Sequence, residues 1–237
     1  MRFRSIIFLV TFSVFSAHGL LAAAEDQYPT LAERLAAGEI EQLPAADRLE
    51  IASDLIRCQW RPLSREEYLK LFRHYQEIGH QVSAEQKQAY HRCIGLTPEG
   101  FYHVESLLGE LADEGNLTAQ LAYFRYVMPS SANRFSYHSP EVSPEEIASN
   151  SERFLLMAAR SGKHMALLHL SDLTHNGPES VRDQVMSAAY LAAYEACTGE
   201  VAAPYMGMHH VYSDSKGLEP NIAYHVEKVV REMGCEN

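Results

Sequence analysis

The stretch LLMAARSGKHMALLHL, which runs from Leu155 to Leu170, decides how this chain folds. It has the pattern of one helix that ends at Gly162 and a second helix that begins directly after it. Glycine can take the left-handed conformation that ends a helix without the steric penalty of a Cβ atom. A small residue in the first turn of the next helix, here Ala166, lets the two helices approach closely. The stretch therefore predicts a helical hairpin with a short hinge.

The same hinge recurs along the chain. The segment LLGELADEGNLTAQLAYF repeats it 47 residues earlier, and two further glycines follow at intervals of 37 and 35 residues. A period in the thirties is typical of stacked helical hairpins, in which each hairpin buries its apolar face against its neighbours. The predicted repeat hinges are Gly115 with Ala119, Gly162 with Ala166, Gly199 with Ala203, and Gly234.

Helix signals dominate the rest of the chain, and strand signals are nearly absent. Capping residues or a proline at a first helical position precede apolar residues at helical spacing, and an earlier helical region is expected from Leu31 to Arg57. We therefore predict an all-α fold. The predicted helix starts are Ser64–Glu67, Thr97–Pro98 and Ser143–Pro144.

Two later segments share one plan: THNGPESVRDQVMSAAYLAAYEACTG (Thr174–Gly199) and SDSKGLEPNIAYHVEKVVREMG (Ser213–Gly234). Each has a polar turn with one glycine, followed by an amphipathic helix that ends at a hinge glycine. This plan resembles the Sel1-like repeat family, relatives of the tetratricopeptide repeats. Tyr190, Ala193 and Ala196 keep the pattern of the family's second helix.

The resemblance covers roughly residues 98–235, is clearest over 152–235, and is degenerate. The middle turn has one glycine where the family has two, and one interval is 47 residues instead of 36 to 38. The resemblance implies an α-solenoid of helical hairpins over residues 96–237, with protein or peptide partners and no enzymatic activity. Residues 25–95 are expected to form a helical region without a convincing repeat. An ordinary bundle of glycine-ended helices is the alternative.

The first 24 residues have the features of a secretory signal peptide. Arg2 and Arg4 precede an apolar run, and Ala22 and Ala24 fit a small-residue cleavage site. The alternative is an uncleaved membrane anchor, for which the run is short, because a span needs about 20 apolar residues. We therefore expect a protein of the periplasm or the secreted fraction, with no membrane span after cleavage.

The charge and the cysteine count bear on which ligands the chain can bind and on its disulfides. Removing residues 1–24 changes the formal charge from −11 to −13, because two arginines and no acid are lost. So acidic a chain repels phosphates, which disfavours nucleic-acid binding. Four cysteines allow three disulfide connectivities, and spacing favours Cys58–Cys93 and Cys197–Cys235, each spanning about one hairpin. No C-x-x-C motif indicates a compact zinc or thiol-exchange site.

Motifs of catalysis and metal binding are weak. The S-x-x-K match at Ser213–Lys216 lacks its companion motifs, and His164 and His169 are five residues apart, a poor spacing for two ligands on one helical face. We expect no catalytic residue, cofactor or metal. The rival hypotheses are an envelope enzyme acting on cell-wall material and a periplasmic metal-binding protein, the latter suggested by histidines such as the adjacent His209 and His210.

The segment from Met128 to Pro144 interrupts the regular part of the chain. It is rich in serine and proline and has no helical period, so it is predicted to be a loop inserted between two helices. Its aromatic side chains either pack on the helices of the same chain or are exposed and available to bind a partner. The residues of this candidate partner loop are Arg134, Phe135, Tyr137 and His138.

Overall fold

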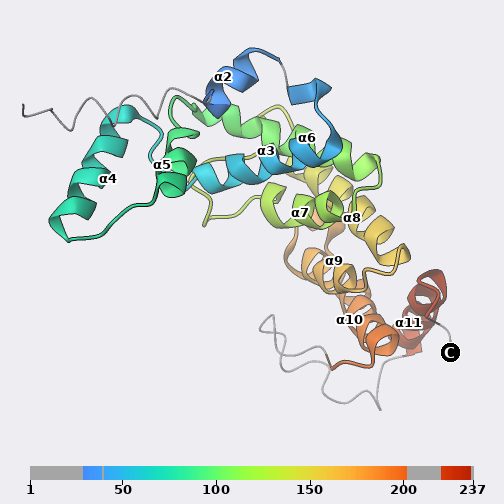
Figure 1. Ribbon diagram of the computed structural model, residues 1–237. Coiled ribbons are helices and arrows are strands. Elements are labelled where there is room, and N and C mark those ends of the chain that lie inside the picture. Colours follow the sequence, from blue (N-terminus) through green and yellow to red (C-terminus); the bar gives the residue numbers. More distant parts are fainter. Residues whose placement is uncertain (1–28, 39, 202–219, 236–237) are drawn as a thin grey trace, which may run out of the picture.

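The computed structural model describes residues 29–38, 40–201 and 220–235 (Figure 1). These residues form ten α-helices and three short 3₁₀ helices, without a strand, so the all-α prediction is confirmed for this part of the chain. The α-helices are α2 (Leu31–Ala36), α3 (Ala45–Cys58), α4 (Arg65–Glu77), α5 (Ala84–His91), α6 (His103–Asp113), α7 (Leu117–Val127), α8 (Pro144–Arg160), α9 (Met165–Asn176), α10 (Gln184–Thr198) and α11 (Pro220–Glu232). The 3₁₀ helices are η1 (Ile40–Gln42), η2 (Pro98–Tyr102) and η3 (Glu179–Val181).

From α6 onward the helices pack in series. Each helix makes its main contacts with the helix before it and the helix after it, and Figure 1 shows this order as the ribbon passes from green to red. In the earlier part, α3 packs against α6, while α4 lies to one side of the array. None of the described helices has both the length and the apolar character required to cross a membrane.

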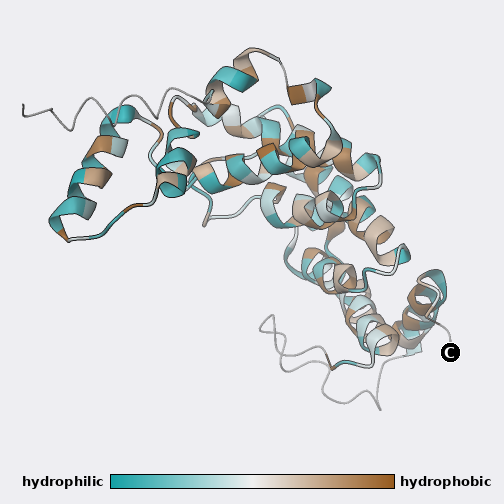
Figure 2. Ribbon diagram, viewed as in Figure 1, coloured by the Kyte–Doolittle hydropathy of each residue, from teal (hydrophilic) through white to brown (hydrophobic). Residues whose placement is uncertain are grey.

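Two apolar clusters follow this serial order. The first joins buried residues from α2 to α8, among them Leu55, Phe101 and Phe154. The second joins residues from α8 to α11, among them Leu155 and Leu170. Figure 2 shows that apolar residues recur along the helices that pack together, whereas much of α4 is hydrophilic. The core is therefore elongated along the array.

The hinge glycines adopt the conformation that the sequence predicts. Gly115 has φ of 86° and Gly162 has φ of 87°, both in the left-handed region. A Cβ atom at either position would meet nothing within 4 Å, so the backbone angle, not a lack of space, is what favours glycine. Gly199 and Gly234 share this conformation, with φ of 70° and 68°.

The small residues that follow the first two hinges are completely buried. Ala119 in α7 and Ala166 in α9 are both 0% exposed, as expected for positions where two helices approach closely. Ala203, the corresponding residue of the third hinge, lies outside the described residues, as does the predicted signal peptide.

The helix starts differ from expectation in two details. Ser64 accepts a hydrogen bond from the Glu67 amide at 3.1 Å, but the Glu67 carboxylate accepts from the amide of Leu63, one residue before the cap. Thr97 makes no side-chain cap, and a 3₁₀ turn with Pro98 at its first position precedes α6. Such turns are common at helix N-termini. At the third predicted start, Ser143 accepts from the Glu146 amide at 3.1 Å.

Both cysteine pairs predicted from spacing lie at disulfide distance. The Cα atoms of Cys58 and Cys93 are 5.4 Å apart, and those of Cys197 and Cys235 are 5.1 Å apart. The first disulfide joins the end of α3 to the segment after α5, and the second joins the end of α10 to the segment after α11. The first disulfide therefore lies in the helical region before α6, and the second links the last two helices of the array.

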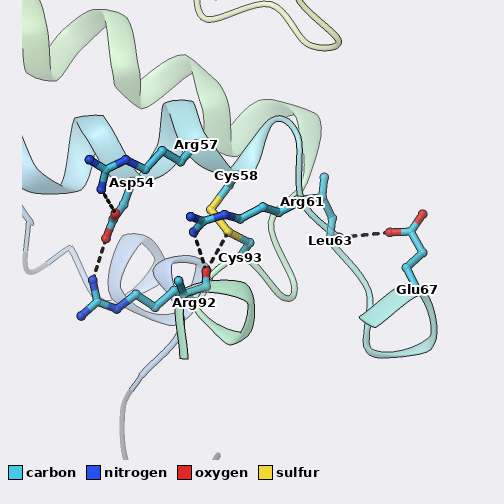
Figure 3. The surroundings of a disulfide bond; sticks show 9 residues. Asp54, Arg57, Cys58, Arg61, Leu63, Glu67, Arg92 and Cys93 are labelled. Carbon is cyan, nitrogen blue, oxygen red and sulfur yellow. Dashed lines mark hydrogen bonds and ion pairs between the residues drawn. A yellow bond between two sulfur atoms is a disulfide. The ribbon is translucent and has the colours of Figure 1, made fainter. Parts of the chain in front are cut away.

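The first disulfide lies among ion pairs and hydrogen bonds (Figure 3). The buried Asp54 carboxylate accepts from Arg57 at 3.2 Å and from Arg92 at 2.7 Å. Arg61 donates to the carbonyl of Ala89 at 2.7 Å. Because Arg92 immediately precedes Cys93, these contacts hold the second cysteine against the end of α3.

Candidate functional site

The aromatic side chains of the candidate partner loop pack back on the helices. Tyr137 is only 2% exposed, and its hydroxyl donates a hydrogen bond to Gln59 Oε1. Phe135 stacks on Phe101 of η2 with ring centroids 4.8 Å apart. Burial raises the pKa of Tyr137 to about 12. Of the two alternatives that the sequence left open, packing on the helices is the one observed, and these two rings are not free to anchor a partner.

The other two residues of the loop remain more accessible. The Arg134 guanidinium lies 4.9 Å from the centroid of the Phe135 ring. Ser136 Oγ lies 3.1 Å from His138 Nδ1 and also donates to the His138 carbonyl at 2.9 Å. These residues line a pocket of about 200 Å³ whose lining holds no carboxylate. A serine–histidine pair needs a third group that orients the histidine to act as a nucleophile and base, so this pair does not form a catalytic triad.

A more polar pocket lies between α8, η3 and the N-terminal half of α10. Its volume is about 270 Å³, and it is open to solvent on one side. Residues of α8, α9, η3 and α10 therefore meet around one cavity, at the polar turn where the sequence places the middle glycine of a repeat. The lining residues are Glu152, Thr174, Ser180, Val181, Arg182, Asp183, Met186 and Tyr190.

The wall formed by the turn is fixed by its own hydrogen bonds. A Cβ atom on Gly177 would lie 2.2 Å from the carbonyl oxygen of Leu173, so only glycine fits at this turn. Arg182 Nη2 donates to the Gly177 carbonyl at 2.9 Å. Asp183 Oδ1 accepts from the amides of Val185 and Met186, at 2.9 and 3.0 Å, and thereby caps α10. Arg182 and Asp183 are therefore engaged in holding the wall.

Glu152 and Tyr190 are two polar residues that line this pocket from different helices. Glu152 is half-buried on α8, and burial raises the pKa of its carboxyl. No hydrogen bond or ion pair to this carboxylate is found within the described ranges. Tyr190 on α10 is 4% exposed, and its pKa is raised first by burial and then by the charge of Glu152. A half-buried carboxylate with a raised pKa in a cavity is a frequent feature of binding and catalytic sites.

Two arginines near this pocket make contacts with groups other than Glu152. Arg182 bonds to the turn, and Arg160 of α8 forms an ion pair with Glu232 of α11 at 3.3 Å. Within the described residues, neither of these arginines forms an ion pair with Glu152. An ammonium or guanidinium group would supply both the opposite charge and hydrogen-bond donors.

The histidines that the sequence offers as candidate metal ligands lie in different parts of the structure. His169 lies against Phe124 with ring centroids 5.2 Å apart, and burial lowers its pKa. His164 instead lies beside the second disulfide, with its Nε2 atom 3.6 Å from Cys235 Sγ. His209 and His210 lie outside the described residues. The structure thus does not bring His164 and His169 together as a ligand pair.

The sequence alone does not predict the pocket lined by Glu152 and Tyr190 or the approach of His164 to Cys235. The repeat pattern marks Tyr190 only as a position of a helix, and Glu152 belongs to no motif. The glycine of the polar turn, Gly177, is the one sequence signal in this region. The approach of His164 to Cys235 spans 71 residues, and no spacing pattern indicates it.

The chain matches no protein-family model, and neither the curated proteins nor the solved structures contain a significant match to it.

Proposed function

We propose that this chain is an exported, non-enzymatic helical-repeat scaffold of the Sel1-like kind, which binds a protein or peptide partner in the cell envelope. The observation that carries the proposal is the series of positive-φ glycines at intervals of 47, 37 and 35 residues. The first three lie between helices that pack one after another, and the fourth follows α11. Arrays of this kind offer a long continuous surface to partners, and their usual function is recognition.

The polar pocket is the contact point that we propose within this surface. The Glu152 carboxylate is half-buried and has no cationic partner among the described residues, which is a costly arrangement for an isolated charge. A lysine or arginine side chain of a bound peptide would restore the charge balance, and the buried Tyr190 lies beside it. The net charge of −11 also favours the approach of a basic partner.

A selection from a displayed library of random peptides tests this proposal. The protein is used without residues 1–24, and the bound peptides are compared with those selected by Glu152→Gln. We expect the unchanged protein to select peptides that contain lysine or arginine. Single-peptide titrations should show at least about tenfold weaker binding to Glu152→Gln, as expected for the loss of a charge-assisted contact.

The matched control is Glu145→Gln, which removes the same charge from an exposed position of the same helix. Its affinity should stay within about twofold of the unchanged protein, because exposed charges contribute little. Equal binding by Glu152→Gln, or selected peptides without a basic residue, would exclude the pocket as the contact point. A failure to select any peptide would count against the scaffold function itself.

A further inference from the structure

The second disulfide has a histidine beside it. His164 is the residue before α9, Cys197 lies in the last turn of α10, and Cys235 follows α11. His164 Nε2 is 3.6 Å from Cys235 Sγ, and the three potential ligand atoms all lie within 4.8 Å of one another. Among residues 29–38, 40–201 and 220–235, this is the one group of three histidine, cysteine or acidic side chains gathered so closely.

The first disulfide differs in each of these respects. Cys58 and Cys93 are 0% exposed, whereas Cys197, Cys235 and His164 are all partly exposed. Cys93 Sγ lies 3.5 Å from the carbonyl of Ala89, and within the described ranges no third ligand gathers around this pair. The chain therefore contains an accessible cysteine pair with a histidine and a buried pair without one.

The distance from His164 to Cys235 suits two ligands of one zinc ion. Zinc bonds to cysteine sulfur at about 2.3 Å and to histidine nitrogen at about 2.0–2.1 Å, so tetrahedral sulfur and nitrogen ligands lie about 3.5–3.6 Å apart. The separation of 3.6 Å between His164 Nε2 and Cys235 Sγ matches that distance without movement. The two sulfur atoms, once no longer bonded, need to separate to about 3.8 Å, which side-chain rotation can supply.

We propose that Cys197, Cys235 and His164 bind Zn²⁺ when the Cys197–Cys235 disulfide has been reduced by a dithiol. In the reduction, the dithiol donates two electrons and two protons, and its own sulfur atoms form a disulfide as the protein bond breaks. Zn²⁺ then displaces the two thiol protons, and the neutral His164 donates its Nε2 lone pair. Water completes the four-coordinate site.

The zinc ion takes the place of the covalent cross-link. The disulfide joins the end of α10 to the segment after α11, and His164 adds the start of α9. Reduction alone removes the link, whereas the metal joins all three segments again. The chain therefore has two cross-linked states, one oxidised and free of metal and the other reduced and zinc-bound.

Metal titration of the protein without residues 1–24 tests this inference. The protein is reduced anaerobically, the reductant is removed, and Zn²⁺ binding is measured against a chromophoric chelator. We expect one zinc per reduced chain and none per oxidised chain. With Co²⁺ in place of Zn²⁺, the reduced protein should show thiolate-to-cobalt charge-transfer absorption, which reports sulfur ligation directly.

The two cysteine pairs supply matched controls. Cys58→Ser/Cys93→Ser should keep the reduced site, whereas Cys197→Ser/Cys235→Ser should lose it. His164→Ala should weaken zinc binding at least about tenfold, since even the loss of an outer partner of a ligand costs that much. His175→Ala, also partly buried and near the other end of α9, should leave binding unchanged.

If reduction destabilises the fold, thermal unfolding provides a second measurement of zinc binding. Zinc should raise the Tm of the reduced protein, and it should not raise that of Cys197→Ser/Cys235→Ser. Equal zinc binding by His164→Ala and the unchanged protein would overturn the site. So would zinc uptake that depends on Cys58 and Cys93, or a reduced chain that binds no zinc and gains no thermal stability.

Discussion

Tyr137 shows how one residue of an irregular segment can hold it in place. Its ring is buried and its hydroxyl bonds to Gln59 Oε1, while Gln59 Nε2 has no hydrogen-bond partner among the described residues. Tyr137→Ser removes the ring and leaves the amide of Gln59 without either partner. We expect the free energy of unfolding, measured by urea denaturation, to fall by about 3–4 kcal/mol.

The exposed Arg134 provides the comparison within the same loop. Among the described residues, Arg134→Ser loses a contact with the face of Phe135, so its effect should stay below about 1 kcal/mol. A loss below about 1 kcal/mol for Tyr137→Ser as well would mean that the ring contributes little to the core.

Glu152 gives a prediction for the pH dependence of stability. Burial raises its pKa above the ordinary value of 4.5, so the folded state favours the protonated carboxyl. Its contribution to stability is therefore greatest below the ordinary pKa and is lost as the pH rises through the folded pKa. Glu152→Gln should have a slightly higher Tm than the unchanged protein at pH 7, by less than about 2 °C because the pocket is open to solvent.

The difference in Tm should become small near pH 4, where the carboxyl is mostly protonated in both states. The measurement is a series of thermal melts of the two proteins from pH 4 to pH 7. A lower Tm for Glu152→Gln at pH 7 would show that the carboxylate has a stabilising partner, and would weaken the argument that it awaits a cation.

At the scale of elements, the hinges are the most direct test of why the helices end where they do. Gly162→Val places a β-branched residue at φ of 87°, and we expect a loss of at least about 1 kcal/mol in urea denaturation. Gly115→Val and Gly199→Val should behave alike, because these positions share the conformation.

Gly109 is the matched control for the hinges. It lies inside α6 without a positive φ, and a Cβ atom there would meet Tyr123 Cε2 at an ordinary 3.5 Å. Gly109→Ala should therefore raise the free energy of unfolding, by up to about 1 kcal/mol, through higher helix propensity. If valine at the hinges were tolerated as well as alanine at Gly109, the left-handed backbone would not be what ends these helices.

The helices were predictable because their signals are local. Ser143 caps the start of α8, and Gly162 follows the C-cap of the same helix. Both effects act within four residues of the helix end. Thr97 was the exception: the chain passes through a 3₁₀ turn whose Phe101 is buried in the first apolar cluster, and this tertiary contact is invisible in a local pattern.

At the scale of the whole molecule, serial packing predicts that one end can loosen without the other. In Cys197→Ser/Cys235→Ser the cross-link between α10 and α11 is lost, and the chain-entropy model assigns about 4 kcal/mol to such a loop. Native-state hydrogen exchange should then become more than about tenfold faster in α11.

Amides of α6 should keep their exchange rates in this variant, because α6 contacts α11 only through the helices between them. Uniformly faster exchange throughout the chain would show that the array opens as a single unit, and would contradict the proposed repeat architecture.

The pocket and the histidine at the disulfide could not be predicted, because both depend on how the array places distant residues. Glu152 and Tyr190 face one cavity only after α8, η3 and α10 have packed. His164 reaches Cys235 only after α11 has returned beside α10. The cysteine pairs were accessible to sequence reasoning because each spans a single unit, 35 and 38 residues long.

The two disulfides close consecutive loops that neither cross nor enclose one another, and this has a consequence during biosynthesis. A chain that emerges N-terminus first exposes Cys58 and Cys93 while Cys197 is still 104 residues away. At roughly 5–20 residues per second, that delay is about 5 to 20 s. The first pair can therefore oxidise before any competing thiol is present, and the last two cysteines are left with only each other. The order of synthesis therefore favours the native pairing without disulfide exchange.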